Sequence, residues 1–208
     1  LKWDDGRMNE IFDFPQLPVS RCLFVPQFNT KMNRSSFNGF EHIVENPGER
    51  WIVSYKFSVL TFEECKVLKA HLAHLRGPVN KTRLYDTTFN QQSGLWAGVP
   101  RVNGAGQYGM MLNADGFVPN LLVASAMDRC VIGEQLLEIR QDCYADEFGR
   151  TTLYFTNELR EPATDNSIIQ SDVSSLKTIA RWIKPEQIQQ LSGNRRLYRN
   201  ITLDFEEA

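Results

Sequence analysis

Apolar and polar residues alternate at every second position in two stretches that lie far apart along the chain. In residues 49–60, one face of the expected strand carries Trp51, Val53, Tyr55, Phe57 and Val59. In residues 197–208, the corresponding face carries Leu197, Ile201, Leu203 and Phe205. A two-residue period is that of a strand with one buried face. We therefore expect both stretches to be strands that lie side by side in one sheet.

The period changes to that of a helix at Thr61. Thr61 and Glu64 form the Ser/Thr-x-x-Glu capping box with which many helices begin. An apolar stripe follows at three- and four-residue steps and comprises Phe62, Cys65, Leu68, Leu72 and Leu75. Arg76-Gly77-Pro78 then supplies a cation, a glycine and a proline, which together end helices. These features predict a helix at 61–76 that covers one face of the sheet.

The segment before residue 49 predicts further strands. Residues 21–28 are rich in β-forming residues, and Pro26 favours an edge strand because proline cannot donate to the hydrogen-bond ladder. We expect a polar loop at 31–36 and a strand at 37–44. Asn46-Pro47-Gly48 is a turn signal that separates this strand from the alternating stretch.

The middle of the chain has a different composition. Gly, Asn, Gln and Ser are frequent in residues 90–107, as in a long loop or a boundary. Turn signals follow at Asp115-Gly116, Ile132-Gly133 and Phe148-Gly149. Short strands are expected between them, at 110–112, 120–124, 128–132, 135–141 and 151–156. Short strands separated by regular turns are typical of small β-barrels and sandwiches.

The polar segment 158–175 leads out of this block, residues 176–183 are expected to form another strand, and residues 185–194 a loop. The chain is thus predicted to hold one β domain built from two separate segments, residues 11–93 and 174–208, with the helix 61–76. A small β domain at 98–165 is inserted into it. The predicted fold class is mainly β (α+β).

Composition and charge exclude several classes of function. The formal net charge of −2 provides no basic stripe to replace the counterions of a nucleic acid. No apolar run approaches the roughly 20 residues that span a bilayer. Residues 1–10 are polar and are not expected to be a secretory signal. The cysteines lack C-x-x-C spacing and are expected to be reduced thiols, with a Cys130–Cys143 disulfide as the alternative.

No pattern predicts a catalytic, cofactor-binding or metal-binding residue, so the chain is not expected to be an enzyme. His71 and His74 share a helix face without a third ligand nearby, which favours partly exposed helix residues over a metal site. The glycines of 104–109 lack the following helix that a dinucleotide loop requires. The carboxylates considered for glycoside hydrolysis are Asp142, Asp146, Glu147, Asp165, Glu206 and Glu207. Turn chemistry explains the pair Asp146-Glu147 without catalysis.

Several short motifs follow one another in a definite order. Pro47-Gly48-Glu49-Arg50-Trp51 opens the first alternating strand, and Leu75-Arg76-Gly77 ends the helix. Residues 102–109 match Val-x-Gly-Ala-Gly-Gln-x-Gly, and Asp115-Gly116-Phe117 follows. Residues 146–153 are similar to the pattern Asp-x-x-Gly-x-Ala-Thr-Leu. Glu158-Leu159-Arg160 is similar to the end of Pro-x-Leu-Arg, with Asn157 in the place of the proline. Residues 198–208 are similar to Tyr-x-x-x-x-x-x-Phe-Glu-Glu-Ala. In this order the motifs resemble the distal tail proteins of long-tailed bacteriophages and the related minor tail proteins of prophages.

The resemblance implies a structural virion protein without a cofactor. Such proteins form a ring, expected to be a homohexamer, that joins the tail tube to the baseplate hub or tail tip and lines the DNA channel. Their fold is similar to that of the tail tube subunit, a β-sandwich or barrel with a flanking helix, in which the sheets of neighbouring subunits pack edge to edge. The implied partners are further copies of the chain, the tail tube protein and the hub or tip proteins, with DNA only in transit. The implied localisation is the tail tip of the virion, after assembly in the cytoplasm of the host bacterium.

The polar faces of the two alternating strands are the expected lining of the channel. These faces carry Ser54, Lys56, Ser58, Asn200, Thr202 and Asp204. The opposite faces, with Val53, Tyr55, Phe57, Ile201, Leu203 and Phe205, are expected to pack on the helix stripe of Phe62, Leu68 and Leu72. The alternative is a monomeric sandwich whose polar faces meet solvent.

Two other functions are compatible with the sequence. One is a carbohydrate-binding β module on a virion surface, in which sugars would stack on Trp96, Trp182, Tyr108 and Tyr144, although aromatic residues of β proteins usually lie in the core. The other is a hydrolase of cell-wall material, suggested by the acid-rich second domain, with Asp146 as the acid to test.

Overall fold

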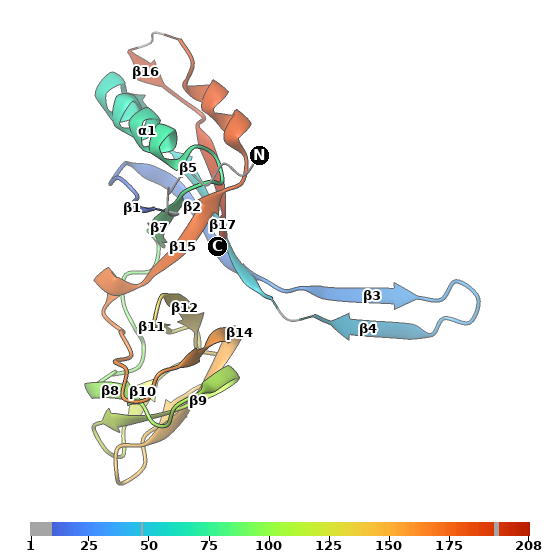
Figure 1. Ribbon diagram of the computed structural model, residues 1–208, viewed down its shortest axis with the longest axis vertical. Helices are drawn as coiled ribbons and strands as arrows, with labels where there is room; N and C mark the ends of the chain where they lie inside the picture. Colours follow the sequence, from blue (N-terminus) through green and yellow to red (C-terminus); the bar gives the residue numbers. More distant parts are fainter. Residues whose placement is uncertain (1–9, 47, 194–195) are drawn as a thin grey trace, which may run out of the picture. The chain divides into compact units, whose positions relative to one another are not determined.

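A computed structural model describes residues 10–46, 48–193 and 196–208 (Figure 1). The polar segment 1–9 and Pro47 of the predicted turn lie outside the described residues. The fold is mainly β with one flanking α-helix, as expected. The chain divides into two compact units: unit 1 contains residues 10–25, 51–90 and 177–208, and unit 2 contains residues 26–50 and 91–176.

Unit 1 is built on a six-stranded sheet. In spatial order its strands are β1 (Ile11–Asp13), β7 (Lys81–Tyr85), β15 (Lys177–Trp182), β17 (Thr202–Glu207), β5 (Arg50–Phe57) and β2 (Val19–Gln27). β1 pairs with β7 in parallel, whereas the pairs β7–β15, β15–β17 and β17–β5 are antiparallel. β2 occupies an edge, as Pro26 predicts, because a proline in a central strand would remove a ladder hydrogen bond.

The two alternating stretches do lie side by side. β17 runs antiparallel to β5, with Leu203 opposite Tyr55 and Phe205 opposite Val53. The closing stretch is not one strand, however. Its first part is β16 (Leu197–Tyr198), which pairs with β6 (Leu60–Thr61), and the left-handed backbone of Asn200 (φ 58°) separates it from β17. Val59 is exposed because β5 ends two residues earlier, at Phe57.

Helix α1 (Phe62–Leu75) covers one face of this sheet. The predicted capping box is present: the Glu64 amide donates to the Thr61 hydroxyl, and the Thr61 amide donates to the Glu64 carboxylate over 2.7 Å. The helix ends at Arg76, whose own backbone is left-handed (φ 52°), one residue before the expected glycine. Its buried residues are Cys65, Leu68, His71, Leu72 and Leu75. Phe62, expected in this stripe, is 47% exposed because it is the first residue of the helix, at its end.

Residues 30–45 form a two-stranded β-hairpin, for which the sequence prediction was partly wrong. β3 (Thr30–Arg34) pairs with β4 (Glu41–Glu45) in the segment where a polar loop was expected. The predicted strand 37–44 is therefore shortened, and residues 35–40 make the turn, closed by a 2.8 Å hydrogen bond from the Ser35 amide to the Phe40 carbonyl. Neither strand buries a complete face, so the hairpin has no two-residue period to detect.

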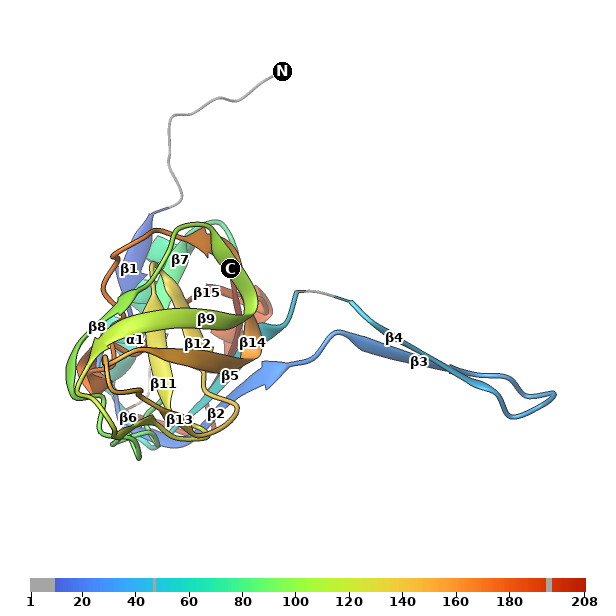
Figure 2. The same cartoon turned by 90° about the horizontal axis from the view of Figure 1, so that it is seen from below.

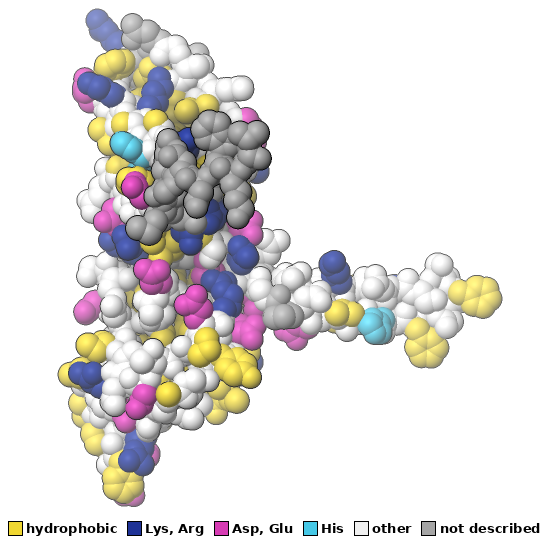
Figure 3. All heavy atoms as spheres, in the orientation of Figure 1, with side chains coloured by type: hydrophobic (Ala, Val, Ile, Leu, Met, Phe, Trp, Pro, Cys, Tyr) yellow, Lys and Arg dark blue, Asp and Glu magenta, His cyan; other side chains and the backbone are white. Residues whose placement is uncertain are grey.

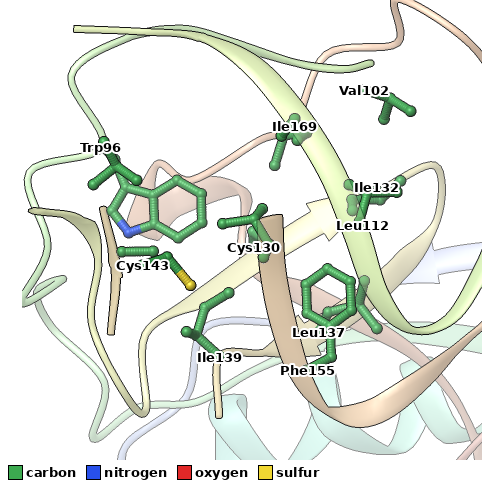
Figure 4. Packing of buried hydrophobic residues seen from close by; sticks show 14 of the residues in the cluster. Trp96, Val102, Leu112, Cys130, Ile132, Leu137, Ile139, Cys143, Phe155 and Ile169 are labelled. Carbon is green, nitrogen blue, oxygen red and sulfur yellow. The ribbon is translucent and has the colours of Figure 1, made fainter. Parts of the chain in front are cut away.

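Besides this hairpin, the described residues of unit 2 form three small sheets. The largest joins β14 (Thr151–Ala163), β9 (Gln107–Phe117) and β8 (Gly98–Val102), and Figure 2 shows β9 and β14 side by side. The other two pair β10 (Leu122–Ala124) with β13 (Cys143–Tyr144), and β11 (Arg129–Ile132) with β12 (Gln135–Glu138). Their buried side chains form one core that includes Trp96, Leu112, Leu137 and Phe155 (Figure 4). The turn at Gly133 is confirmed, and the strands predicted at 128–132 and 135–141 are present with shorter bounds, the second ending at Glu138.

Several boundaries in this unit differ from the prediction. β8 lies within the predicted loop 90–107, and β14 continues through 158–163, where the chain was expected to leave the domain. Asp115-Gly116 is not a turn but part of β9. Gly116 has φ 79°, and a Cβ there would lie 2.3 Å from the Val99 carbonyl oxygen, because β8 passes very close. The described residues also form two short 3₁₀ helices, η1 (Val173–Ser175) and η2 (Pro185–Leu191). The second lies in the segment 185–194 that was predicted to be a loop.

Candidate functional site

The residues predicted to line a channel meet where β5 and β17 pair. Ser54 lies opposite Asp204, and Lys56 lies opposite Thr202. Ser58 and Asn200 lie just outside the two strands. Of the six residues, Lys56 and Asn200 are exposed and the other four are partly buried. The sheet therefore gathers most of the predicted polar set on one face, opposite the face that packs on α1.

Asp204 is the most constrained member of this polar set. Its Oδ1 accepts a 2.6 Å hydrogen bond from the Ser54 hydroxyl, and its Oδ2 accepts 2.8 Å bonds from Lys184 Nζ and Gln187 Nε2. Burial acts to raise the pKa of the Asp204 carboxyl, but the hydrogen bonds from Lys184, Ser54 and Gln187 outweigh it, so the pKa lies below its ordinary range. Asp204 is thus a structural acceptor rather than a freely exposed lining residue.

Glutamine side chains from η2 complete the ladder of β17. β15 pairs with β17 only at Phe205, Glu206 and Glu207. The first residues of β17, from Thr202 to Asp204, therefore have no paired strand on the edge that faces β15. The Thr202 amide donates to Gln190 Oε1 over 2.8 Å, and the Asp204 amide donates to Gln187 Oε1 over 3.0 Å. Sequence reasoning missed these residues because they stand in an apparent polar loop, and nothing in their spacing indicates a bond to β17.

The apolar face of the same strands packs as expected. Val53, Tyr55, Phe57, Ile201, Leu203 and Phe205 are all buried. Phe14, which the sequence analysis did not assign, lies between this face and the helix, with ring centroids 5.8 Å from Phe205 and 5.1 Å from His71. A continuous aromatic layer therefore joins sheet and helix.

The two helix histidines occupy different environments. His71 was expected to be partly exposed, but it is buried because the ring turns toward the sheet, where its Nε2 lies 3.1 Å from Thr82 Oγ1. Burial, together with electrostatic repulsion from His74, lowers the pKa of His71 to about 4. The described residues contain no group of three or more histidine, cysteine, aspartate or glutamate side chains that could hold a metal ion.

Three of the carboxylates considered for hydrolysis accept hydrogen bonds from nearby loops. Asp142 accepts from the Ser125 hydroxyl, Asp146 from the amides of Phe148 and Arg150, and Asp165 from the Gly104 amide. A further buried carboxylate was not predicted. Asp128 accepts from the amides of Ser93, Gly94 and Ser125 and from the Trp96 indole. These bonds organise the loops around the core of unit 2.

The cysteines and the candidate sugar-stacking aromatics are also placed by the fold. All four cysteines are free thiols, so a Cys130–Cys143 disulfide is not formed. Burial raises the pKa of the Cys130 thiol, which keeps it protonated. Trp96 and Trp182 are core residues and present no face to a ligand. Tyr108 and Tyr144, by contrast, are 69% and 65% exposed.

The β3–β4 hairpin carries the most exposed apolar residues of the described chain, a feature that sequence reasoning missed. Phe37 is 99% exposed, Phe40 is 76% exposed, and the cross-strand pair Met32 and Ile43 are each 63% exposed. Figure 3 shows yellow hydrophobic side chains gathered at the end of the hairpin. The hairpin is also a separate two-stranded sheet, with no third strand beside it among the described elements.

Comparison of the chain with family models and with curated proteins finds no match. Within the described part of the chain, no helix combines the length and the apolar character that crossing a membrane requires.

Proposed function

We propose that this chain is a structural subunit of the distal ring of a long-tailed phage tail. Copies of it would close around a channel through which DNA passes, and the ring would join the tail tube to the baseplate hub or tail tip. The motif resemblance described above motivates the proposal. The observation that carries it is the exposed apolar surface of the β3–β4 hairpin.

The hairpin has the properties of an element that is ordered by a neighbouring chain. An isolated two-stranded hairpin is marginally stable in water. The hairpin buries no complete face, and its turn exposes Phe37 and Phe40 to solvent. Large apolar groups that cluster on the surface of a soluble protein mark interaction sites. A ring supplies such a site, because each copy presents the same surface to the next one.

The six-stranded sheet supports the same role. Its edge strands β1 and β2 leave ladder groups open, and edge strands are normally covered or paired. β2 also exposes Leu23 (42%) and Val25 (41%) on the side opposite Phe24. Pairing of neighbouring sheets in a closed ring would satisfy these edges, and the polar face with Lys56 would then line the channel.

The oligomeric state of the purified chain tests the proposal. Multi-angle light scattering should give about six times the mass of one chain for the wild type. The double substitution Phe37→Ser with Phe40→Ser should lower the mass to that of a single chain while leaving the circular dichroism spectrum unchanged. Phe148→Ser is the matched control, because Phe148 is 71% exposed but lies outside the hairpin. A wild type that stays a single chain at every concentration, or a hairpin variant that assembles normally, would contradict the proposal.

A further inference from the structure

An open groove lies on the surface of unit 2, over the start of β9 and the adjoining β14. It has a volume of about 280 Å³ and is lined by Gly106, Gln107, Tyr108, Met111, Leu112, Asn113 and Thr152. None of these residues carries a formal charge. Side chains of a strand alternate between its two faces. Leu112 and Ala114 of β9 are buried, so Met111 and Asn113 point outward. The volume is near the lower end of small-molecule sites, and suits a ligand of one or two rings.

The floor of the groove is held in place by hydrogen bonds within the β8–β9 hairpin. Gln107 Nε2 donates to the carbonyls of Asn103 (2.8 Å) and Gly104 (3.0 Å), and its Oε1 accepts from the Asn113 amide over 2.7 Å. The Thr152 hydroxyl donates to Asn113 Oδ1 over 2.9 Å, which fixes the carboxamide. A site whose groups are already ordered loses little conformational entropy when it binds a ligand.

One aromatic ring and one amide remain available to a ligand. Tyr108 is 69% exposed and lines the groove, so a large part of its side chain is open to a ligand. Among the described residues, Asn113 Nδ2 has no hydrogen-bond partner, although Oδ1 of the same amide is occupied. Met111, which is 56% exposed, adds a polarizable apolar surface to the lining of the same groove.

We propose that this groove binds a sugar of the N-acetylhexosamine class. The apolar face of a pyranose ring stacks on Tyr108, Asn113 Nδ2 donates to the acetamido carbonyl, and the acetamido methyl contacts Met111. The absence of charge in the lining disfavours phosphorylated or acidic ligands, whose desolvation would be uncompensated. The openness of the groove leaves the outer hydroxyls in water, so binding is weak, with a Kd on the order of 1 mM. This inference does not depend on the ring: a single chain and an assembled ring would both carry the groove.

Nuclear magnetic resonance titration of the full chain with N,N′-diacetylchitobiose tests the proposal. The amide signals of Tyr108, Asn113 and Thr152 should shift saturably, and saturation transfer should be strongest to the sugar ring protons that lie on Tyr108. Cellobiose, which lacks the acetamido groups, should bind several times more weakly. No saturable shift up to about 20 mM sugar would overturn the proposal, and equal binding of cellobiose would overturn the acetamido contacts.

Three variants separate stacking from nonspecific effects. Tyr108→Ala should raise the Kd by about tenfold, as expected when a central aromatic contact is removed. Tyr108→Phe keeps the ring and should bind as the wild type does. Tyr144→Ala is the matched control, because Tyr144 is similarly exposed (65%) in the same unit but does not line the groove. A loss of binding in Tyr144→Ala, or normal binding in Tyr108→Ala, would place the sugar elsewhere and contradict the proposal.

Discussion

Ser54 and Asp204 face each other across β5 and β17, and the Ser54 hydroxyl donates a 2.6 Å hydrogen bond to the Asp204 carboxylate although 150 positions separate the two residues. The same carboxylate accepts bonds from Lys184 and Gln187. β5, β17 and the η2 region therefore meet at one acceptor, and β5 is far from the other two in the sequence.

Asp204→Ala should destabilise unit 1 more than Ser54→Ala does. The first substitution leaves three donors without their acceptor, whereas the second removes one bond. We expect the free energy of unfolding to fall by about 2 kcal/mol for Asp204→Ala and by about 1 kcal/mol for Ser54→Ala, measured by urea unfolding at pH 7. Equal losses in the two variants would show that the junction is not centred on Asp204.

The contribution of Asp204 should also depend on pH. The pKa of this carboxyl lies below its ordinary value of 3.8 in the folded chain, so the folded state binds a proton less readily than the unfolded state. The stabilisation is therefore complete above pH 3.8 and is lost as the pH falls through the lower pKa of the folded state. The difference in unfolding free energy between the wild type and Asp204→Ala should shrink below pH 4. A difference that stays constant down to pH 2 would contradict the assignment.

His71 should make the fold less stable in mild acid. Its pKa falls from an ordinary 6.5 to about 4 in the folded chain. Between these values the unfolded state takes up a proton that the folded state does not, so stability decreases as the pH falls from 6.5 to 4, by on the order of 3 kcal/mol in total. His71→Gln should remove most of this slope in urea titrations, although it will also lower stability at pH 7. His42→Gln, on the exposed strand β4, is the control and should retain the slope.

Two glycine-to-alanine substitutions should separate the effect of steric crowding on stability from the effect of backbone strain. The substitution Gly116→Ala introduces both, whereas Gly106→Ala introduces strain alone. The two glycines have similar φ, 79° and 76°, so an alanine at either position is strained by about 1 kcal/mol. A Cβ at Gly116 would also lie 2.3 Å from the Val99 carbonyl oxygen, whereas a Cβ at Gly106 meets nothing within 4 Å. Gly116→Ala should therefore lower the melting temperature several times more than Gly106→Ala. Similar losses would mean that β8 does not pass as close to β9 as described.

The sequence predicts best the elements that bury one complete face. β5 was predicted because Trp51, Val53 and Tyr55 all point to the core, and α1 was predicted because its cap and its stripe agree. β3 was missed because all its residues are exposed, so no burial contrast marks the strand. The turn predicted at Asp115-Gly116 was wrong because the glycine is required by the approach of β8, which is a tertiary cause that local turn chemistry cannot distinguish.

The polar residues of the candidate site were predictable only in part. Alternation placed Ser54 and Asp204 on one face of each strand, and the pairing of β5 with β17 brings them together. The alternation could not indicate that Gln187 and Gln190 accept hydrogen bonds from β17 amides in place of a neighbouring strand. This role depends on where β15 stops pairing with β17. Nor could the alternation identify the groove at Tyr108, which depends on the residues that β9 and β14 turn outward side by side.

Electron microscopy of the purified chain tests the ring most directly. Class averages of negatively stained particles should show a closed ring with six-fold symmetry and a central hole, and the ring should be absent from the Phe37→Ser, Phe40→Ser double variant. The Phe148→Ser control should form the same ring as the wild type. Particles without a central hole, in a wild-type sample that is folded and concentrated, would contradict the proposal that copies of this chain enclose a channel.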